Sequence, residues 1–364
     1  MMADSIVIAG GGTGGHLYPG IALARTIMKH DPDIDITFIG TRQGIESRVL
    51  PREGLKLKTI YSGGLLGKKG LGKIVNWLKL PVSLLQSAAF LLAHRPRLVV
   101  GVGGYVSGPV GLSAWLLRIP LLIHEQNTVP GATNRWLGKI ADRVAITFAS
   151  SKKYFPACKA VETGNMIREE FTRGTEAQTA AAKKFTVLVL GGSQGAHSIN
   201  AAVLKALDVL QPVKERLHLI HQTGQADEAE VQETYTRHGF SAEAQAFIFD
   251  MAEQYQKASL VICRSGATTL AEVTALGIPS VLVPFPFAAH NHQVHNAREL
   301  ESGGAARVIL DHELDGGQLA AIILEGMEHP ERLREMAENS FRLGRRDATE
   351  SVRRLCMDLM HRPE

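Results

Sequence analysis

The chain has 364 residues, of which 45% are hydrophobic and 21% are charged, with a formal net charge of +4, a composition typical of an ordinary soluble globular protein long enough for two domains. Its three cysteines are widely spaced and form no Cys-x-x-Cys pair, which argues against a disulfide framework or a zinc ribbon and fits a reducing cytoplasm. The N-terminus has no basic segment followed by a long apolar core, so we expect no signal peptide.

The first predicted elements are a strand, a glycine-rich turn and a helix. Residues 5–9 form an apolar run, residues 10–16 read Gly-Gly-Gly-Thr-Gly-Gly-His, and a helical pattern continues from Ile21. Glycines let the backbone approach a bulky ligand, and the N-terminus of a helix favours negative charge there. His16 adds a titratable side chain, which a phosphate cradle does not need but a reaction centre can use.

The same glycines also fit the glycine part of the dinucleotide-binding fingerprint of dehydrogenases. Gly10, Gly12 and Gly15 match Gly-x-Gly-x-x-Gly. That fingerprint also needs an acid at the end of the second strand, where it would bind a ribose. The second strand is predicted at 34–39 and continues into residues 40–42 (Gly-Thr-Arg) without an acid. The sequence therefore argues against a dehydrogenase.

A basic stretch follows in the first half of the chain. No Asp or Glu occurs between Gly54 and His124. Within it, residues 68–93 combine lysines, Trp77 and a mostly apolar helix, but polar residues and a proline interrupt every run of the about 20 residues needed to span a bilayer. Such a surface suits the interface of an anionic membrane, and a buried helix with solvated lysines is the alternative. We expect no nucleic acid partner, because no basic motif is interleaved with stacking aromatics.

Strand and helix signals alternate along the whole chain. Apolar runs typical of buried parallel strands occur in two successive sets, at 5–9, 34–39, 98–102, 120–124 and 143–148, and at 186–190, 217–221, 247–249, 260–263 and 280–283. The pattern predicts an α/β protein of two doubly wound, Rossmann-like domains that face a ligand cleft. We expect the domains at 1–165 and 166–344, with the C-terminal helix at 345–364 packing back on the first.

Glycine loops recur at the ends of other predicted strands. Residues 101–108 and 191–195 both follow apolar runs, as residues 10–16 do. Any one of them could be a tight turn. Three such loops at strand ends on both sides of a predicted cleft favour phosphate binding.

Polar side chains cluster at the end of the strand predicted at 120–124. The cluster reads His124, Glu125, Gln126 and Asn127, and it stands where sites form in α/β sheets. A helix cap by Asn127 is the structural alternative.

The strand predicted at 260–263 leads into a helix with a second set of polar residues. Ser265 is the expected helix cap, and Gly266 leaves the first amides open to an anion. Glu272 lies on the same helical face as Thr268 and is placed to accept hydrogen bonds from both hydroxyls of a ribose. An acid that interacts with the helix dipole is the alternative for Glu272.

We expect no metal ion. The histidines within 290–296 lack the His-Glu-x-x-His spacing and a nearby cysteine, and Gln293 and Asn296 look like hydrogen-bonding groups that face the cleft. The Asp-x-Asp sequences within residues 31–35 lie before and at the start of a predicted strand, away from the edge of the sheet where ligands are expected. We therefore interpret them as a surface turn and not as metal ligands. A leaving diphosphate would then be stabilised by helix N-termini, glycine-loop amides and Arg168.

Together these motifs resemble the MurG family, glycosyltransferases of family 28 with the glycosyltransferase-B architecture. The motifs come in the family's order and span roughly residues 6–300. They are 11–16 (Gly-Gly-Thr-Gly-Gly-His), 103–108 (Gly-Gly-Tyr-Val-Ser-Gly), 124–127 (His-Glu-Gln-Asn), 191–195 (Gly-Gly-Ser-Gln-Gly), 264–272 (Arg-Ser-Gly-Ala with Thr269 and Glu272) and 292–297 (His-Gln with Asn-Ala). One departure is Met166, where the family commonly has proline.

The resemblance implies transfer of N-acetylglucosamine from UDP-N-acetylglucosamine to undecaprenyl-pyrophosphoryl-N-acetylmuramyl-pentapeptide (lipid I), which gives lipid II for peptidoglycan. It implies donor contacts from the C-terminal domain: diphosphate by Ser193, Ala267, Thr268, Thr269, Leu270 and Ala271, ribose by Glu272, uracil by the backbone of Ile248, and sugar by Gln293. It implies sugar contacts from Thr13, Gly14, Gly15 and Asn127, and acceptor contacts from Gly103, Gly104 and Tyr105.

The expected reaction is one inverting displacement. The muramyl 4-hydroxyl attacks the anomeric carbon of the UDP-sugar, forms a β-1,4 linkage and releases UDP. Histidine, with an unperturbed pKa of about 6.5, suits removal of the hydroxyl proton at neutral pH. His16 is the first choice for this base and Glu125 the second, and a positioning or pyrophosphate-binding role is the alternative for His16.

Two other functions stay open. A UDP-N-acetylglucosamine 2-epimerase of the same architecture would need no basic, apolar docking surface. A non-catalytic, membrane-docked nucleotide-sugar binder would bind the donor without making a product. The basic apolar stretch favours a lipid-linked acceptor, so we expect a peripheral protein on the cytoplasmic face of the cell membrane. We expect no cofactor, and cell-wall synthesis proteins are candidate partners.

Overall fold

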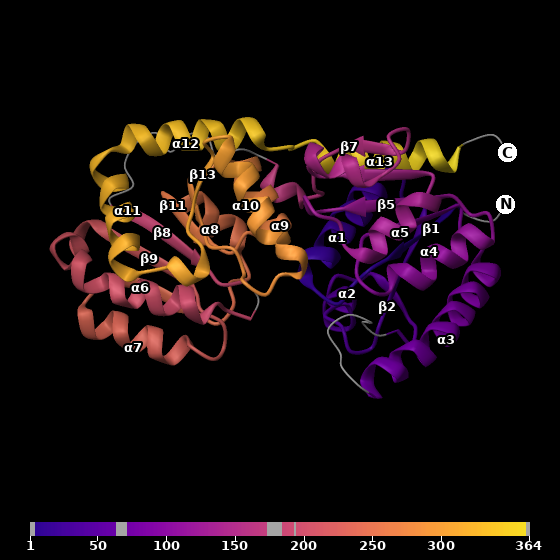
Figure 1. The fold of residues 1–364 in the computed structure, drawn as a ribbon, viewed down its shortest axis with the longest axis horizontal. Helices are drawn as coiled ribbons and strands as arrows, with labels where there is room; N and C mark the ends of the chain where they lie inside the picture. Colours follow the sequence, from indigo (N-terminus) through magenta and orange to yellow (C-terminus); the bar gives the residue numbers. More distant parts are fainter. Residues whose placement is uncertain (1–3, 63–70, 173–183, 193, 362–364) are drawn as a thin grey trace. The chain divides into compact units, whose positions relative to one another are not determined.

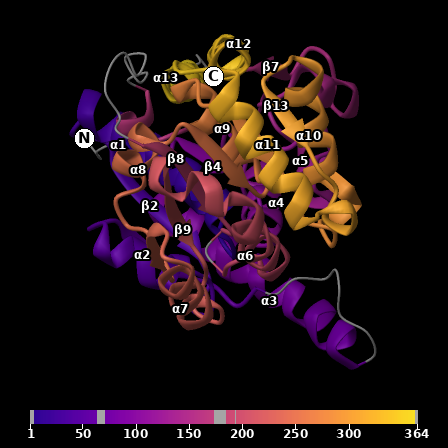
Figure 2. The ribbon, with the colours of Figure 1, turned by 90° about the vertical axis from the view of Figure 1, so that its left-hand side faces the viewer.

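The computed structural model describes residues 4–62, 71–172, 184–192 and 194–361, with the backbone alone for 71–79. The chain forms two compact units. Unit 1 comprises Met1–Arg168 with Asp347–Glu364, and unit 2 comprises Glu169–Arg346. Each unit is built on a parallel sheet with helices on both faces, as Figures 1 and 2 show. The predicted fold class of two doubly wound α/β domains is confirmed.

The sheet of unit 1 has the strand order β3-β2-β1-β4-β5-β6-β7. Its strands are β1 Ser5–Ala9, β2 Asp35–Gly40, β3 Lys56–Thr59, β4 Leu98–Gly101, β5 Leu121–Glu125, β6 Arg143–Ile146 and β7 Ala160–Glu162. Its helices are α1 Gly14–His30, α2 Glu46–Arg52, α3 Leu71–His94, α4 Ser107–Leu116, α5 Ala132–Ile140 and α13 Ala348–Met360, with a 3-10 turn η1 at Ala149–Tyr154.

Strand β1 explains why continuous apolar runs predict the strands of such a sheet. Ile6 and Ile8 belong to the core that helices α1 and α13 complete, whereas Val7 and Ala9 belong to the core beneath α3 and α4. Successive side chains of a strand point to opposite faces, and both faces are covered by helices. The four buried positions, Ile6 to Ala9, are therefore all apolar.

The sheet of unit 2 has the strand order β10-β9-β8-β11-β12-β13. Its strands are β8 Phe185–Leu190, β9 Leu217–Gln222, β10 Ser241–Gln245, β11 Leu260–Cys263, β12 Ser280–Leu282 and β13 Ala306–Val308. Its helices are α6 His197–Leu210, α7 Glu228–His238, α8 Met251–Lys257, α9 Ala267–Leu276, α10 His292–Ser302, α11 Gly316–Glu328 and α12 Pro330–Leu343. Its 3-10 turns are η2 Glu169–Phe171, η3 Gln211–Arg216, η4 Ala289–Asn291 and η5 Asp311–Glu313.

One predicted strand is wrong, and four of the strands in the described residues were not predicted. Residues 247–249 are not a strand, and β10 lies earlier, at Ser241–Gln245. The sequence of β10, Ser-Ala-Glu-Ala-Gln, has no strong apolar pattern because it is an edge strand with half-exposed side chains. Strands β3 and β13 are edges too, and so is the three-residue β7, so burial imposed little pattern on them.

The C-terminal helix α13 packs on helix α1 of unit 1. Val352 and Cys356 are fully buried in the core that α1 shares. The hydroxyl of Thr349 donates to the carbonyl of Ile167 at 2.8 Å and accepts from its N–H at 3.1 Å. Helix α13 thus holds the segment that leaves unit 1.

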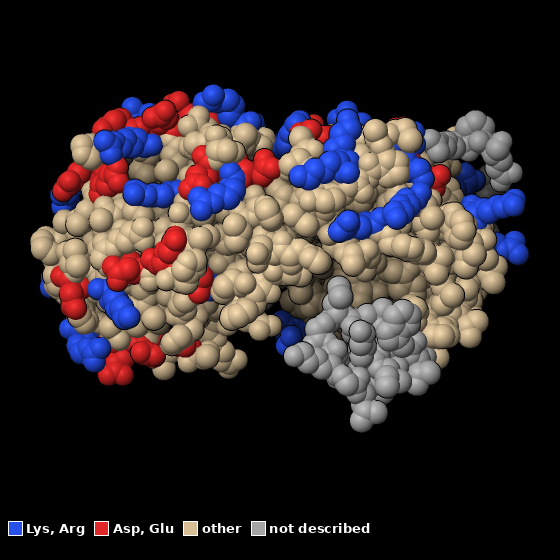
Figure 3. Space-filling view, in the orientation of Figure 1, with Lys and Arg blue, Asp and Glu red and all other residues tan. Residues whose placement is uncertain are grey.

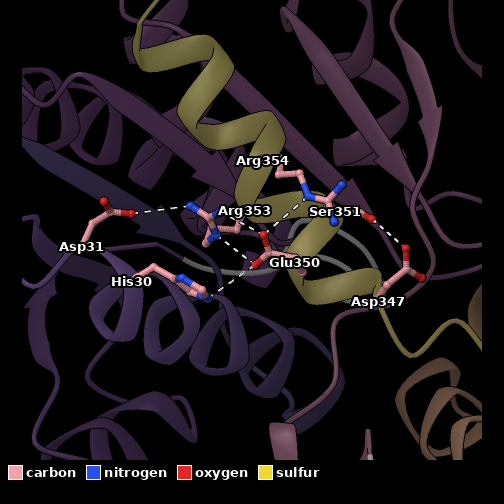
Figure 4. A network of polar contacts seen from close by, with 7 residues as sticks. All are labelled: His30, Asp31, Asp347, Glu350, Ser351, Arg353 and Arg354. Carbon is pink, nitrogen blue, oxygen red and sulfur yellow. Dashed lines mark hydrogen bonds and ion pairs between the residues drawn. The ribbon is translucent and has the colours of Figure 1, made fainter.

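A network of ion pairs adds to this contact, and Figure 4 shows it from close by. The Arg353 guanidinium lies 2.8 Å from the Glu350 carboxylate and 3.5 Å from that of Asp31, which caps α1. His30 lies 3.8 Å from Glu350. Because Arg353 donates to it and is positively charged, the pKa of Glu350 lies below its usual value.

Candidate functional site

Each sheet has one point at which the strand order reverses. In unit 1 it lies between β1 and β4, and in unit 2 between β8 and β11. Connections from the two strands run to opposite faces there and leave a crevice in which α/β proteins bind ligands. Glycine loops follow these strands: loop 1 (residues 10–13) after β1, loop 2 (residues 102–106) after β4, and loop 3 (residues 191–196) after β8.

Loops 1 and 2 of unit 1 lie backbone against backbone. Gly104 has φ +81°, and a Cβ there would lie 2.5 Å from the carbonyl oxygen of Gly11. A Cβ at Gly12 would lie 3.2 Å from the ring of Tyr105. Glycine is therefore required for this close approach, and the structure brings the predicted acceptor residues to loop 1.

His16 follows loop 1 on the first turn of α1 and lies over loop 2. A Cβ at Gly103 would lie 2.7 Å from His16 Nδ1. The Ser107 hydroxyl fixes Gly103 from the other side, because it accepts from the Gly103 N–H at 3.1 Å and donates to the Ala9 carbonyl at 2.8 Å. The half-exposed imidazole of His16 thus has a defined position at the crevice of unit 1.

A second histidine lies behind this position, at the end of β5. His124 is fully buried and donates from Nε2 to the carbonyl of Gly164 at 3.3 Å. Burial lowers the pKa of His124 to about 4; the bond to the Gly164 carbonyl acts in the opposite direction, and the nearby His16 contributes to the lowering. His124 is therefore neutral at physiological pH and is a poor candidate for the base.

Glu125 is buried among amide donors. Its Oε1 accepts from the backbone N–H of Asn127 at 2.9 Å and from the side-chain amide of Asn127 at 3.2 Å, and its Oε2 accepts from Asn134 at 2.9 Å. Burial raises the pKa of Glu125, although these bonds act in the opposite direction. Both oxygens are used to orient asparagines, so the geometry favours His16 over Glu125 as the base.

The start of α1 presents the other predicted residues of unit 1. Thr13 and Gly15 are exposed and Gly14 is half-exposed. Thr13 is the N-cap, but its hydroxyl makes no cap bond to the helix. The Arg168 guanidinium lies 5.5 Å from the centre of the Tyr18 ring on α1, a cation–π contact that keeps Arg168 on unit 1.

Loop 3 of unit 2 is packed as tightly as loops 1 and 2. Gly195 has φ +80°, and a Cβ at Gly224 would lie 2.5 Å from the Gln194 carbonyl oxygen. The backbones after β8 and β9 therefore touch. Ser193, the predicted diphosphate ligand, lies outside the described residues.

Gln222 joins loop 3 to the predicted uracil residue. Its amide nitrogen donates to the Gly192 carbonyl at 2.9 Å, and its oxygen accepts from the Ile248 N–H at 3.0 Å. The Ile248 N–H is thus engaged. A contact between uracil and this backbone would use the Ile248 carbonyl or displace Gln222.

The cap of α9 differs from the prediction. Gly266 is the N-cap, and the Ser265 hydroxyl donates instead to the Gln293 carbonyl at 2.8 Å. Asn296, expected to face the cleft, is fully buried and donates to the Ser265 carbonyl at 3.3 Å. Both side chains fix the loop that precedes α9 and do not point to a ligand.

The predicted diphosphate residues of α9 divide into two kinds. Ala267 and Leu270 are buried, whereas Thr268, Thr269 and Ala271 are half-exposed. The first amides of a helix have no acceptor within the helix and bind anions. A diphosphate would therefore bind to backbone N–H groups, and the threonine hydroxyls could add to them.

Glu272 and Gln293 lie near this helix start in partly exposed positions. The Glu272 carboxylate accepts from the Tyr255 hydroxyl at 3.3 Å. The Gln293 oxygen accepts from the Phe285 N–H at 3.0 Å, so its amide nitrogen points elsewhere. The Tyr255 hydroxyl thus orients the Glu272 carboxylate, and the Phe285 N–H orients the Gln293 amide.

Arg264 belongs to the resemblance motif but binds protein groups. It pairs with Asp311 and donates to the carbonyls of Val283 and Pro284, both at 3.2 Å, and to the Ser198 hydroxyl at 2.8 Å. It therefore ties the ends of β11 and β12 to helix α6.

The structure reveals two site residues that no motif indicated, Gln222 and Glu46. Glu46 is fully buried and accepts from the Gly12 N–H of loop 1 at 2.9 Å. Its only signal in the sequence is an isolated acid close to Gly40 and Gly44. Among the described residues, no group of three His, Cys, Asp or Glu could hold a metal ion, and the absence of a metal stays a prediction.

Apolar side chains are exposed on helices α3 and α4, which pack together in unit 1. Leu85 is 70% exposed and Trp115 is 48% exposed, and Val82, Leu92 and Leu116 are exposed too. Unit 1 shows more Lys and Arg than Asp and Glu on the face drawn in Figure 3. In the part of the chain that the structure describes, no helix is both long and apolar enough to span a membrane.

Comparisons with known proteins give consistent results. The model of the glycosyltransferase family 28 N-terminal domain matches residues 6–146, and that of the C-terminal domain matches residues 186–352. A Myxococcus xanthus protein named UDP-N-acetylglucosamine--N-acetylmuramyl-(pentapeptide) pyrophosphoryl-undecaprenol N-acetylglucosamine transferase is 45% identical over 98% of this chain and 93% of its own length.

Solved structures share the fold. MurG of Acinetobacter baumannii is 30% identical, with a TM-score of 0.79 over 98% of this chain and 99% of its own. A UDP-GlcNAc 2-epimerase from Neisseria meningitidis, bound to UDP-GlcNAc, has a TM-score of 0.69 over 98% of this chain and 100% of its own. The epimerase is 12% identical, so its likeness concerns the fold alone.

Proposed function

The chain belongs to glycosyltransferase family 28, and from this premise we propose that it transfers N-acetylglucosamine from UDP-N-acetylglucosamine to lipid I, releasing UDP and giving lipid II. The observation that carries the proposal is the pair of crevices at the two switch points. The crevice of unit 1 contains His16, which lies over two glycine loops whose backbones are in contact. The crevice of unit 2 contains loop 3, the α9 N-terminus and Glu272. One crevice offers a base and the other offers anion and ribose contacts.

Unit 2 binds the donor in this proposal. The amides at the start of α9 and loop 3, with Ser193, hold the diphosphate, and Glu272 accepts from the ribose hydroxyls. Ile248 contacts uracil through its backbone, and Gln293 contacts the sugar. Unit 2 keeps its loop 3 and uracil segment together through Gln222.

Unit 1 binds the acceptor. Gly103, Gly104 and Tyr105 contact its pyrophosphate, while Thr13 to Gly15 and Asn127 contact the transferred sugar. Glu125 orients Asn127, because its carboxylate accepts from the backbone N–H and from the side-chain amide of that residue.

The reaction is a single inverting displacement. The muramyl 4-oxygen forms a bond to the anomeric carbon, the bond from that carbon to the UDP oxygen breaks, and the hydroxyl proton moves to His16. The electron pair leaves with the diphosphate, whose charge the α9 amides and Arg168 stabilise. General base catalysis by a positioned imidazole contributes about 10²–10⁴-fold in such steps.

Lipid I is membrane-bound, and unit 1 carries the surface for it. Leu85 and Trp115, with the basic stretch 68–93, would rest on the anionic cytoplasmic face of the cell membrane. Lys68 and Lys69 lie outside the described residues, and so do the side chains of Lys73 and Trp77.

The test is incubation with labelled UDP-N-acetylglucosamine and a lipid I analogue, with identification of the products. The proposal expects a β-1,4-linked disaccharide on the lipid and one UDP for each disaccharide. A 2-epimerase would convert the free UDP-sugar to its 2-epimer without the acceptor. A non-catalytic binder would bind the donor and give neither product.

A further inference from the structure

Glu46 is a carboxylate buried at the back of the unit 1 crevice. It stands in the first turn of α2 and is fully buried. Its Oε2 accepts from the Gly12 N–H at 2.9 Å, and its Oε1 accepts from the Thr41 N–H at 2.8 Å and the Thr41 hydroxyl at 2.9 Å. Among the described residues no Lys or Arg forms an ion pair with it, so these three donors are what compensates its burial.

Glycines shape the space that Glu46 fills. A Cβ at Gly11 would lie 2.5 Å from the Glu46 Cδ, and one at Gly40 would lie 2.5 Å from its Cγ. A Cβ at Gly44 would overlap the carboxylate oxygens. Three segments, loop 1, the end of β2 and the turn before α2, therefore close around one carboxylate.

The same carboxylate is linked to loop 2. The Thr41 hydroxyl donates to Glu46, accepts from the Gly44 N–H at 3.1 Å and lies 3.5 Å from the Tyr105 hydroxyl. Because the Thr41 hydroxyl has one hydrogen, which goes to Glu46, Tyr105 is the donor in the contact between the two hydroxyls. Glu46 is thus bonded directly to loop 1 and through Thr41 to loop 2.

We propose that Glu46 is a positioning residue for the transfer step: its carboxylate fixes loop 1 through the Gly12 N–H and thereby sets where α1 begins and where His16 lies against loop 2. The proposal rests on the proposed function, because it assigns Glu46 to the acceptor side of that reaction. Glu46 does not touch a substrate in this scheme. It acts through loop 1, whose displacement by about 1 Å can cost a factor of about 10² in turnover.

The acceptor-only character of the carboxylate is essential to this role. Three donors converge on two oxygens, so a side-chain amide cannot replace the acid. In Glu46→Gln the amide oxygen can serve Thr41, but the amide nitrogen then faces the Gly12 N–H, donor against donor. The volume hardly changes, so the variant breaks the tether to loop 1 with little change in packing.

The experiment compares the full-length parent, Glu46→Gln and a control, Glu53→Gln. Glu53 is the C-cap of the same helix, has a side chain that is 42% exposed, and pairs with Arg25 of α1 at 3.1 Å. For each protein we would measure kcat and KM with the lipid I analogue, UDP binding by calorimetry, and hydrogen exchange of the amides of residues 10–13.

We expect Glu46→Gln to lower kcat by about tenfold to a hundredfold. UDP affinity and stoichiometry should match the parent, because UDP binds to unit 2. Exchange of the loop 1 amides should accelerate, since the Gly12 N–H has lost its acceptor. Glu53→Gln should stay within about twofold of the parent in every measurement, as expected for an exposed pair.

Parent-like kcat and parent-like exchange in Glu46→Gln would overturn the proposal. A fall in kcat that only follows a loss of UDP-binding sites would indicate that the variant is unfolded. If Glu46→Gln does not fold, Thr41→Val carries the test: it should lower kcat severalfold with unchanged UDP affinity, Thr41→Ser should restore it, and parent-like turnover of Thr41→Val would reject the proposal.

A failure of the proposed function is recognised separately. If the parent makes no disaccharide from lipid I, the assigned reaction is wrong. The exchange rates of loop 1 do not depend on that reaction, so they still decide whether Glu46 holds the loop.

Discussion

His16 is the residue on which the proposed chemistry of unit 1 depends most. His16→Ala is expected to lower kcat by about 10²–10⁴-fold, because general base catalysis contributes that much. Steady-state kinetics with the lipid I analogue would measure kcat, with UDP calorimetry as the control. Turnover within about threefold of the parent would exclude His16 as the base.

Gly103 sets the space available to the His16 ring. Gly103→Ala would place a methyl group 2.7 Å from Nδ1 and would force an L-residue to φ +96°. We expect about 1–2 kcal/mol less free energy of unfolding from this backbone strain, and a fall in kcat of about tenfold or more from displacement of the ring. Urea unfolding and kinetics would test the two effects.

Gly131→Ala is the matched control for this substitution. Gly131 has φ −62°, and its added Cβ would meet nothing within 4 Å. Because Gly131 is the N-cap of α5, where alanine is less favourable than glycine, the comparison uses turnover, which should match that of the parent. Equal losses in both variants would contradict the role of Gly103.

At some positions the residue type and its place in the sequence predicted a role in the site, and at other positions they did not. His16, Glu125 and Glu272 stand at strand ends or helix starts, where patterns locate them. Ser265, Asn296 and Arg264 carry polar groups too, yet they bind protein backbone or side chains. The sequence could not separate these two classes, because the orientation of a side chain depends on neighbours that are distant along the chain.

At the scale of elements, helix α13 is held on unit 1 by an ion-pair network that is sensitive to pH. Glu350→Gln removes the partner of Arg353 and His30 and should lower the free energy of unfolding by about 0.2–1 kcal/mol at pH 7, as for other partly exposed pairs. Urea unfolding of parent and variant would measure the difference.

The sign of the pH dependence follows from the lowered pKa of Glu350. Its stabilisation is complete above the unfolded-state pKa of about 4.3 and is lost as the pH falls through the lower folded-state value. Parent and variant should therefore become equally stable at acidic pH. Asp358→Asn, an exposed change on the same helix, should match the parent throughout. A difference between parent and Glu350→Gln that persists at acidic pH would argue against the pairing.

Elements buried on both faces were predictable, and edge elements were not. The central strands β1, β4, β8 and β11 have continuous apolar runs because helices cover both faces of their sheets. The edge strand β10 is half-exposed, so the apolar run at 247–249 was mistaken for it. The strands predicted from strong apolar patterns begin and end within a few residues of the observed strands.

At the scale of the whole molecule, we expect peripheral binding to vesicles of anionic phospholipid that weakens as salt rises. A variant with Trp77→Ser and Lys68, Lys69 and Lys73 neutralised should bind less in a co-sedimentation assay. Leu85→Ser with Trp115→Ser should also bind less, because both side chains are exposed on unit 1.

Val209→Ser is the control for the apolar changes. Val209 is an exposed residue of α6 in unit 2, away from the basic stretch in sequence. It should bind vesicles as the parent does. Unchanged binding in the Trp77 and lysine variant would remove the argument for a lipid-linked acceptor from this stretch.

The sequence by itself determined the class of fold, the strands at the centre of each sheet and the glycine loops that follow them. It could do so because burial on both faces and positive φ angles restrict residue types locally. The functional domains at 1–165 and 166–344, and the site residues, stay predictions.

The tertiary structure alone decided which polar groups meet. It brought Glu46 to Gly12, Gln222 to both Gly192 and Ile248, and the His16 ring over Gly103. Most of these partners are far apart in the chain, and neither member of a pair indicates the other. Their approach depends on strand order and on the close packing of glycine backbones, which no local pattern of residues contains.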